Sequence, residues 1–419
     1  LLSPHYWPTA IIEDESLKGL SGSLMWMNVK SEEVKEVMAK YLEYLLPAAA
    51  KYKSLTNICI TNEPTLISSN SDYYHDDFVE YLKGVYNNDL AEYNRINGTN
   101  LSDFSEIQMP KDTQPSVLLY DWKQFNDNLV YEWSSWAAEE VHKYLPDIPV
   151  HCKIMQNIYD DDAALRVHIL YGSNIEKYAK FSDVHGCDAF NYYNPVKQAQ
   201  MYGNNTNPTS TSALEKTMWY DLLTSIKYRP VYNTEDHIIA DSSKRYDHNI
   251  AYHVGADIWQ GALHGRGYTN IWVWSRKYYD EALANSILTR PDAIMEVSRS
   301  SLDLNRLSYE AAALADKNPD TALLWSDTSR IYQNAYANNL YKAYEASVYS
   351  GQKTGFVSEN NIEKAYNHKV LICPDVVNIK EENARKLLDY AKSGRKLVLL
   401  GSDSLTKDEH NQPLDENLV

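Results

Sequence analysis

Hydrophobic positions in the first part of the chain recur at two different spacings. From Ser31 to Leu45 they recur every three or four residues, the period of an amphipathic helix, after a capping serine and two acidic residues. The stretch Leu55–Ile60 is short, apolar and β-branched, and it ends at the polar sequence Asn62-Glu63-Pro64. This pattern predicts a helix followed by a buried strand.

The alternation of helix and strand continues to about residue 274. A long polar stretch follows the first strand, and a helix with aromatic residues near one face then precedes the next strand. Strands that alternate with helices are typical of βα units and a parallel sheet. The further predicted strands cover residues 149–155, 188–193, 230–235 and 270–274, and the further helices cover residues 78–86, 122–144, 214–226 and 249–264.

The loops after these strands favour one α/β architecture over another. No glycine-rich phosphate loop follows any strand, which disfavours a nucleotide-binding sheet. The alternative is a (βα)8 TIM-type barrel whose N-terminal strands are missing, with the end of one cut strand at residue 1. Functional side chains of such barrels lie at the C-terminal ends of the strands. We therefore expect residues 1–318 to form a partial (βα)8 catalytic barrel.

The pattern changes near Asp316–Pro319. Beyond this point, strands are predicted at residues 321–325, 370–374 and 396–401, and helices at 331–349 and 381–393. The rhythm predicts a second, open α/β unit of flavodoxin-like type over residues 319–419, which we expect to be truncated.

Composition excludes several classes of function. The 419 residues carry 40 basic and 57 acidic side chains, and the net charge of −17 disfavours a nucleic-acid partner. No apolar run reaches the length of about 18 residues that a membrane span needs. The 34 tyrosines and 10 tryptophans far outnumber the 6 phenylalanines, and such side chains stack on sugars while forming hydrogen bonds. Four cysteines without zinc-type spacing indicate no metal site, and no cofactor is predicted.

Two glutamates carry the chemical hypothesis. Glu63 and Glu235 each end a predicted apolar strand, where a carboxylate has no structural task, and a parallel barrel brings strand ends together. Two carboxylates that face one bond can cleave a glycoside: one protonates the leaving oxygen, and the other attacks the anomeric carbon or activates water. A lone carboxylate at a strand end is more often solvated or ion-paired, so the hypothesis rests on the pair.

Several separate segments resemble one family of enzymes. Asn62-Glu63-Pro64 matches the Asn-Glu acid/base motif of the retaining (βα)8 glycosidases of clan A. Within that clan the chain looks most like the family 42 β-galactosidases. Residues 319–419 are similar to that family's flavodoxin-like trimerisation domain. The other segments that carry the resemblance are residues 1–8, 81–94, 191–195 and 272–276.

The resemblance implies roles for the two glutamates. Glu63 would be the general acid/base, and it must hold a proton when the reaction starts. Glu235 would be the nucleophile of a double displacement. The chain would then be a β-galactosidase-like glycosidase of carbohydrate metabolism, with a carbohydrate as its substrate.

The resemblance also implies residues that bind the sugar. Asn62 would hold the sugar 2-hydroxyl, Tyr193 would hydrogen-bond the nucleophile, and Trp274 would stack on the sugar ring. Tyr192 replaces Tyr193 if the strand register differs by one residue. His5 is a further substrate-binding candidate.

The resemblance also concerns the oligomeric state and the extent of the chain. It implies a homotrimer, and the absence of the first barrel strands indicates that the chain is a fragment. The localisation stays open between the bacterial cytoplasm and secretion, because no leader sequence is recognisable at the start of the chain.

Three alternatives stay open at the level of sequence. The stretch Asn233–His237 is not typical of family 42, which leaves another clan A glycanase, agarase-like or mannosidase-like. A catalytically inactive carbohydrate-binding relative is the second alternative. The third is an aldolase or isomerase barrel, in which Lys153 would form a Schiff base.

Overall fold

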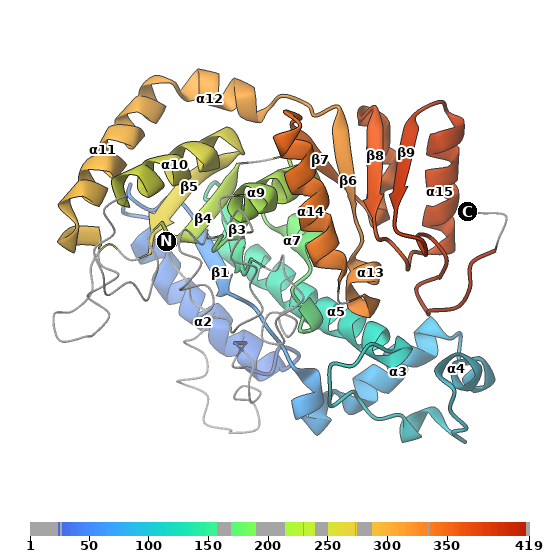
Figure 1. Cartoon of the computed structure of the whole chain (residues 1–419). Helices are drawn as coiled ribbons and strands as arrows, with labels where there is room; N and C mark the ends of the chain where they lie inside the picture. Colours follow the sequence, from blue (N-terminus) through green and yellow to red (C-terminus); the bar gives the residue numbers. More distant parts are fainter. Residues whose placement is uncertain are drawn as a thin grey trace.

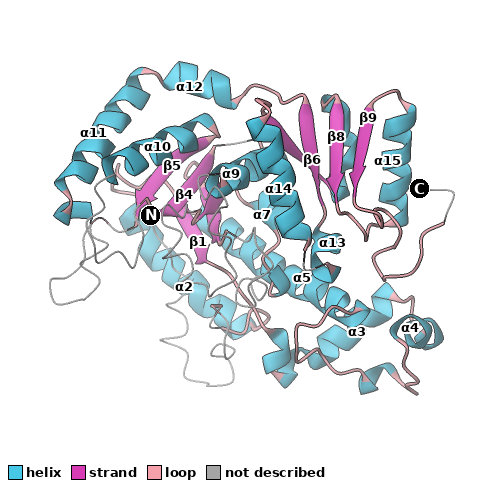
Figure 2. Cartoon of the chain, viewed as in Figure 1, coloured by secondary structure: helices cyan, strands magenta, loops and turns pink. Residues whose placement is uncertain are grey.

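Two parallel sheets stand side by side in the molecule, with helices around and between them (Figures 1 and 2). The computed structural model describes residues 24–25, 27–156, 169–189, 214–228, 230–238, 250–272, 274, 287–333 and 335–415. Among these residues, no helix is both long enough and apolar enough to cross a membrane.

The first sheet contains five strands in the order β1-β2-β3-β4-β5, and every neighbouring pair is parallel. Parallel strands that follow the chain order, each separated from the next by helical segments, fit part of a (βα)8 barrel. The strands are β1 (Ile58–Asn62), β2 (Val150–Ile154), β3 (His185–Cys187), β4 (Val231–Asp236) and β5 (Arg266–Ile271).

The helices of this part begin where the sequence supplies capping side chains. The Ser31 hydroxyl accepts a hydrogen bond from the backbone N–H of Val34, and Ser116 caps a 26-residue helix in the same way. The helices are α2 (Glu32–Ala49), α3 (His75–Val85), α4 (Leu90–Asn97), α5 (Val117–His142), α7 (Ile175–Phe181), α9 (Glu215–Ile226), α10 (Ile250–Leu263), α11 (Pro291–Arg306) and α12 (Ser308–Ala315).

The second sheet contains four parallel strands in the order β7-β6-β8-β9. Numbered along the chain from β6, this order is 2-1-3-4. The strands are β6 (Thr321–Trp325), β7 (Thr354–Ser358), β8 (Val370–Pro374) and β9 (Lys396–Leu400). The helical segments are α13 (Asp327–Tyr332), α14 (Tyr336–Tyr349), the 3-10 segment η7 (Glu359–Asn367) and α15 (Glu381–Lys392).

Some predicted elements differ from the observed ones. Strand β3 lies before the predicted strand at 188–193, of which residues 190–193 fall outside the described part. Its Gly186 is required because a Cβ there would lie 2.0 Å from Nδ1 of His151. Strand β5 begins at Arg266 and ends at Ile271, earlier than predicted, because its polar residues hide the strand pattern. The predicted helix at 331–349 is two helices, and strand β7 was not predicted.

One hydrophobic core connects the two sheets. The same cluster of buried side chains includes Val231 of β4 and Leu323 of β6. Polar contacts reinforce it: the Tyr344 hydroxyl donates to Asp221 Oδ2 at 2.6 Å, and the Phe356 N–H donates to Ser225 Oγ at 3.0 Å. The second sheet and its helices thus pack against the outer helix α9 of the first sheet.

Candidate active site

Two adjacent carboxylates of strand β4 lie in different surroundings. Asp236 is fully buried and contacts Lys216 and Arg266, the latter at 2.5 Å. Glu235 instead contacts Lys153 of β2 and His237. The pairing of β4 with β5 shifts register between Asn233 and Asp236. Neighbouring side chains lie on opposite faces of a strand, and an irregularity decides which of them faces the site.

The backbone at Glu63 is strained. Glu63 directly follows β1 and has a φ of 48°, in the left-handed region, where a residue with a Cβ pays about 1 kcal/mol or more. Its N–H donates to the carbonyl oxygen of Lys153 at 2.8 Å, which ties the glutamate to the neighbouring strand. Such strain occurs at functional sites, where the surrounding structure holds a residue in an unfavourable conformation.

The ammonium group of Lys153 bridges the two predicted catalytic glutamates. Nζ lies 3.1 Å from Glu63 Oε1 and also contacts Glu235 Oε2. Since both oxygens bind one nitrogen atom, they lie within about 6 Å of each other, twice the length of a hydrogen bond. The lysine side chain is only 2 % exposed, whereas each glutamate side chain is 18 % exposed. The structure therefore brings Glu63 and Glu235 together and leaves part of each accessible to solvent.

The charges around this lysine perturb several pKa values. Burial lowers the pKa of Lys153, but the charges of Asp188, Glu63 and Glu235 outweigh burial and raise it. Burial raises the pKa of Glu235, but hydrogen bonds from His237 and Lys153 and the lysine charge hold it below its ordinary value. Burial, together with the charges of Glu63 and Glu235, raises the pKa of Asp188 well above its usual range, against the charge of Lys153. The cluster thus favours an anionic Glu235 beside a protonated Lys153.

Two of the predicted sugar-binding residues, Asn62 and Trp274, lie in the described part of the chain. Asn62 ends β1, next to Glu63, and its backbone pairs with Lys153. Trp274 is 45 % exposed and lies beyond the end of β5 rather than within a strand. Tyr193, its alternative Tyr192 and His5 lie outside the described residues.

Sequence reasoning missed the role of three residues around the glutamates. Lys153 was considered only as a Schiff-base lysine, but its carboxylate partners favour the protonated, non-nucleophilic amine, which argues against that chemistry. Asp188 follows β3 and accepts a hydrogen bond from the Gln156 N–H at 2.8 Å. The Nε2 atom of His237 lies 3.2 Å from Glu235 Oε1. A lysine within a buried, apolar strand is the signal that could have revealed this cluster.

Two histidines of the first sheet, His151 and His185, are buried. His151 is buried, with Nε2 3.1 Å from Asn57 Oδ1, and burial lowers its pKa to about 4. Burial likewise lowers the pKa of His185 to about 3. Within the described ranges, no group of three or more His, Cys, Asp or Glu side chains is arranged to hold a metal ion.

Comparisons with known proteins show the family of the chain. The family model of glycoside hydrolase family 42, described as β-galactosidase, matches residues 12–249. No curated protein matched the chain.

Three solved structures illustrate the likeness in fold. The family 42 exo-carrageenase from Bacteroides ovatus is 21 % identical, with a TM-score of 0.82 over 99 % of this chain and 58 % of that chain. A catalytic mutant of Gan42B, a family 42 β-galactosidase from G. stearothermophilus, is 18 % identical, with a TM-score of 0.75 over 94 % and 59 %. The β-galactosidase from Halorubrum lacusprofundi is 17 % identical, with a TM-score of 0.72 over 95 % and 62 %.

The chain spans about three fifths of the length of these solved structures. At such identities the structural likeness speaks for the fold alone. The family model, in contrast, matches the sequence itself over more than half of the chain, including β1 with Glu63 and β4 with Glu235. The chain therefore belongs to glycoside hydrolase family 42.

Proposed function

We propose that this chain carries the catalytic centre of a retaining, β-galactosidase-like glycosidase, with Glu63 as acid/base and Glu235 as nucleophile. The observation that carries the proposal is the shared contact of both carboxylates with Nζ of Lys153. The resulting limit of about 6 Å between the two oxygens is close to the spacing of about 5–5.5 Å in retaining enzymes.

The two glutamates act in two displacements. In the first, Glu63 donates its proton to the glycosidic oxygen while a Glu235 oxygen forms a bond to the anomeric carbon, and the leaving alcohol departs. In the second, the ionised Glu63 takes a proton from water, the water oxygen attacks the anomeric carbon, and the bond to Glu235 breaks. A low pKa suits the nucleophile, because Glu235 must be ionised to attack and to leave.

The substrate class that we propose is a β-galactoside or a related β-glycan. Solved neighbours named β-galactosidases and one named an exo-carrageenase support this class. Asn62 adjoins Glu63 and would hold the sugar 2-hydroxyl, and the exposed ring of Trp274 would stack on the sugar. Tyr193 and His5 remain sequence-based candidates for the same site.

The test is hydrolysis of a panel of aryl β-glycosides that includes galactosides, mannosides and glucosides. We expect the wild-type chain to release the aryl group from galactosides and Glu235→Gln to do so with a kcat/KM about ten-thousandfold lower. The matched control is Glu359→Gln, which alters a glutamate directly after β7 in the second sheet. NMR of the first sugar product should show the β-anomer, because two inversions retain the configuration.

Each other outcome of this experiment has a definite meaning. Hydrolysis that survives Glu235→Gln at a rate near that of the wild type would remove this residue as the nucleophile. A preference for mannosides would move the chain to another substrate class of clan A. A wild-type chain that binds galactosides without cleaving them would make it a carbohydrate-binding relative.

We also infer that residues 319–419 form a flavodoxin-like domain separate from a catalytic barrel at 1–318. The strand order 2-1-3-4 supports this inference, because the flavodoxin-like order begins in the same way.

The proposed homotrimer can be tested by light scattering coupled to size-exclusion chromatography. A monomeric mass would contradict it.

A further inference from the structure

We propose that Lys153 is a positioning residue, which holds the two catalytic glutamates at their working separation and keeps the nucleophile ionised. This inference rests on the proposed glycosidase function. It assigns no covalent role to the lysine.

The lysine contacts the carboxylates from the side away from solvent. Its side chain is 2 % exposed, whereas both glutamate side chains are 18 % exposed. A sugar arrives from the solvent side and meets the accessible parts of Glu63 and Glu235. The ammonium group is therefore covered by protein, while part of each glutamate remains accessible to a substrate.

The backbone of Lys153 is fixed between its neighbours. It pairs with Asn62 of β1 on one side and with Gly186 of β3 on the other. Its carbonyl oxygen accepts the N–H of Glu63 at 2.8 Å, so one residue positions Glu63 through both main chain and side chain. Sites built on strands hold catalytic groups more accurately than sites built on loops.

Negative charge exceeds positive charge around the lysine. Glu63, Glu235 and Asp188 all act on Lys153, and His237 contacts the Glu235 oxygen that the lysine does not contact. Within the described residues, the lysine is the permanent cation of this cluster. Without it, two or three carboxyl groups would share a partly buried space, and like charges raise one another's pKa values. The lowered pKa of Glu235 is consistent with this arrangement.

The experiment compares the pH dependence of kcat/KM in three variants. Lys153→Met removes the charge but keeps the length of the side chain. We expect the acid limb of its pH profile, where kcat/KM falls as the pH is lowered, to move up by about one pH unit or more, a tenfold effect. Lys153→Arg keeps the charge but not the geometry, so the acid limb should stay while kcat/KM falls about tenfold. An acid limb in Lys153→Met that coincides with that of the wild type would overturn the proposal.

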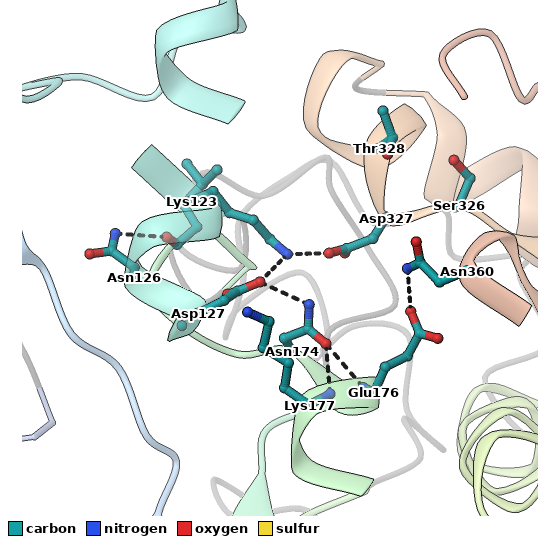
Figure 3. A network of polar contacts seen from close by, with 12 residues as sticks. Lys123, Asn126, Asp127, Asn174, Glu176, Lys177, Ser326, Asp327, Thr328 and Asn360 are labelled. Carbon is teal, nitrogen blue, oxygen red and sulfur yellow. Dashed lines mark hydrogen bonds and ion pairs between the residues drawn. The ribbon is translucent and has the colours of Figure 1, made fainter. Parts of the chain in front are cut away.

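The matched control is Lys123→Met. Lys123 is another buried lysine that bridges two carboxylates: it lies 2.7 Å from Asp127 Oδ2 and also contacts Asp327, in the network between the two sheets (Figure 3). Its replacement should lower the thermal stability and leave the acid limb unchanged. A similar shift of the acid limb in this control would mean that any buried lysine produces the effect.

Two further outcomes keep the test decisive. If Lys153→Met does not fold, Lys153→Arg decides alone, and an unchanged kcat/KM in that variant would contradict the positioning role. If the wild type cleaves no glycoside, the proposed function fails, and the melting temperature against pH tests the lysine separately. Lys153→Met should then lose stability more steeply than the wild type between about pH 4.5 and 7, because its uncompensated carboxylates ionise. Parallel curves would overturn the charge role of Lys153.

Discussion

The carboxyl edges of the two sheets carry glutamates in similar positions but in different surroundings. In the first sheet, Glu63 follows β1 and Glu235 lies near the end of β4, and both contact a lysine while remaining partly exposed. In the second sheet, Glu359 follows β7 and is 2 % exposed. Its oxygens accept hydrogen bonds from the Thr328 N–H at 2.8 Å and from the Thr328 and Ser326 hydroxyls, each at 2.9 Å.

The difference shows that a strand-end position is insufficient to mark a catalytic carboxylate. Glu359 fixes the start of α13, and its hydrogen-bonding capacity is used by the protein itself. Glu63 and Glu235 contact a cation from the buried side and retain access to solvent, which a group that reacts with a sugar needs. The partners and the exposure of a carboxylate distinguish the two cases.

The largest expected effect is on activity. Replacing Glu235 by Gln removes the nucleophile, and kcat/KM should fall about ten-thousandfold, whereas Glu359→Gln should keep kcat/KM within about twofold of the wild type. Initial rates with an aryl β-galactoside measure both. Comparable losses in the two variants would erase the functional distinction between the two edges.

The next effect is on stability. Glu359→Ala leaves the Thr328 N–H and hydroxyl without their acceptor and removes one of the two acceptors of the Ser326 hydroxyl, and the free energy of unfolding should fall by about 3 kcal/mol. Urea unfolding followed by circular dichroism measures the change. The residual folded enzyme should keep its kcat, since Glu359 touches neither glutamate. A loss of kcat in folded protein would contradict this division of roles.

The pH dependence of stability sharpens the same comparison. Burial raises the pKa of Glu359 to about 7, although hydrogen bonds from Thr328 and Ser326 oppose the rise. The folded chain therefore keeps a proton that the unfolded chain releases near pH 4.5, so this stabilisation is complete below pH 4.5 and is lost as the pH rises through 7. Glu359→Gln should remove a decline of about 3 kcal/mol between these values. Unfolding free energies at pH 5 and pH 8 check this, and an unchanged difference would contradict it.

The smallest effect concerns two tryptophans. Trp274 is 45 % exposed, whereas Trp325 at the end of β6 is 2 % exposed, with the Arg330 guanidinium 4.9 Å from its ring centre. If Trp274 stacks on the sugar, Trp274→Ala should raise KM about tenfold at nearly constant stability. Trp325→Ala should lower stability and leave KM unchanged. Steady-state kinetics at several galactoside concentrations separate the two, and an unchanged KM in Trp274→Ala would remove it from the site.

Much of the fold follows from local patterns. The strands β1, β2, β6 and β8 were predicted near their observed positions, and β1, β6 and β8 are short runs of mostly apolar residues. Strand β3 has only three residues, one of them a glycine, and β5 carries Arg266, whose charge is paired with Asp236 and Asp257. Such strands depend on tertiary contacts, and the sequence pattern alone does not reveal them.

The candidate site was predictable in part for the same reason. Glu63 and Glu235 are visible as strand-end carboxylates, and the family resemblance names them. The bridge through Lys153 depends on how β2 lies beside β1 and on the register shift in β4, neither of which local sequence encodes. The roles of Asp188 and His237 emerge only once these strands are placed.

The single core that joins the sheets has a consequence for how the protein melts. Helix α9 contributes Asp221 and Ser225 to contacts with Tyr344 and Phe356, and the buried cluster continues from β4 to β6. Elements that share a core unfold cooperatively, so heat should produce one transition rather than two. Substitutions that strengthen the second sheet would then extend the working temperature of an enzyme whose reacting groups they never touch.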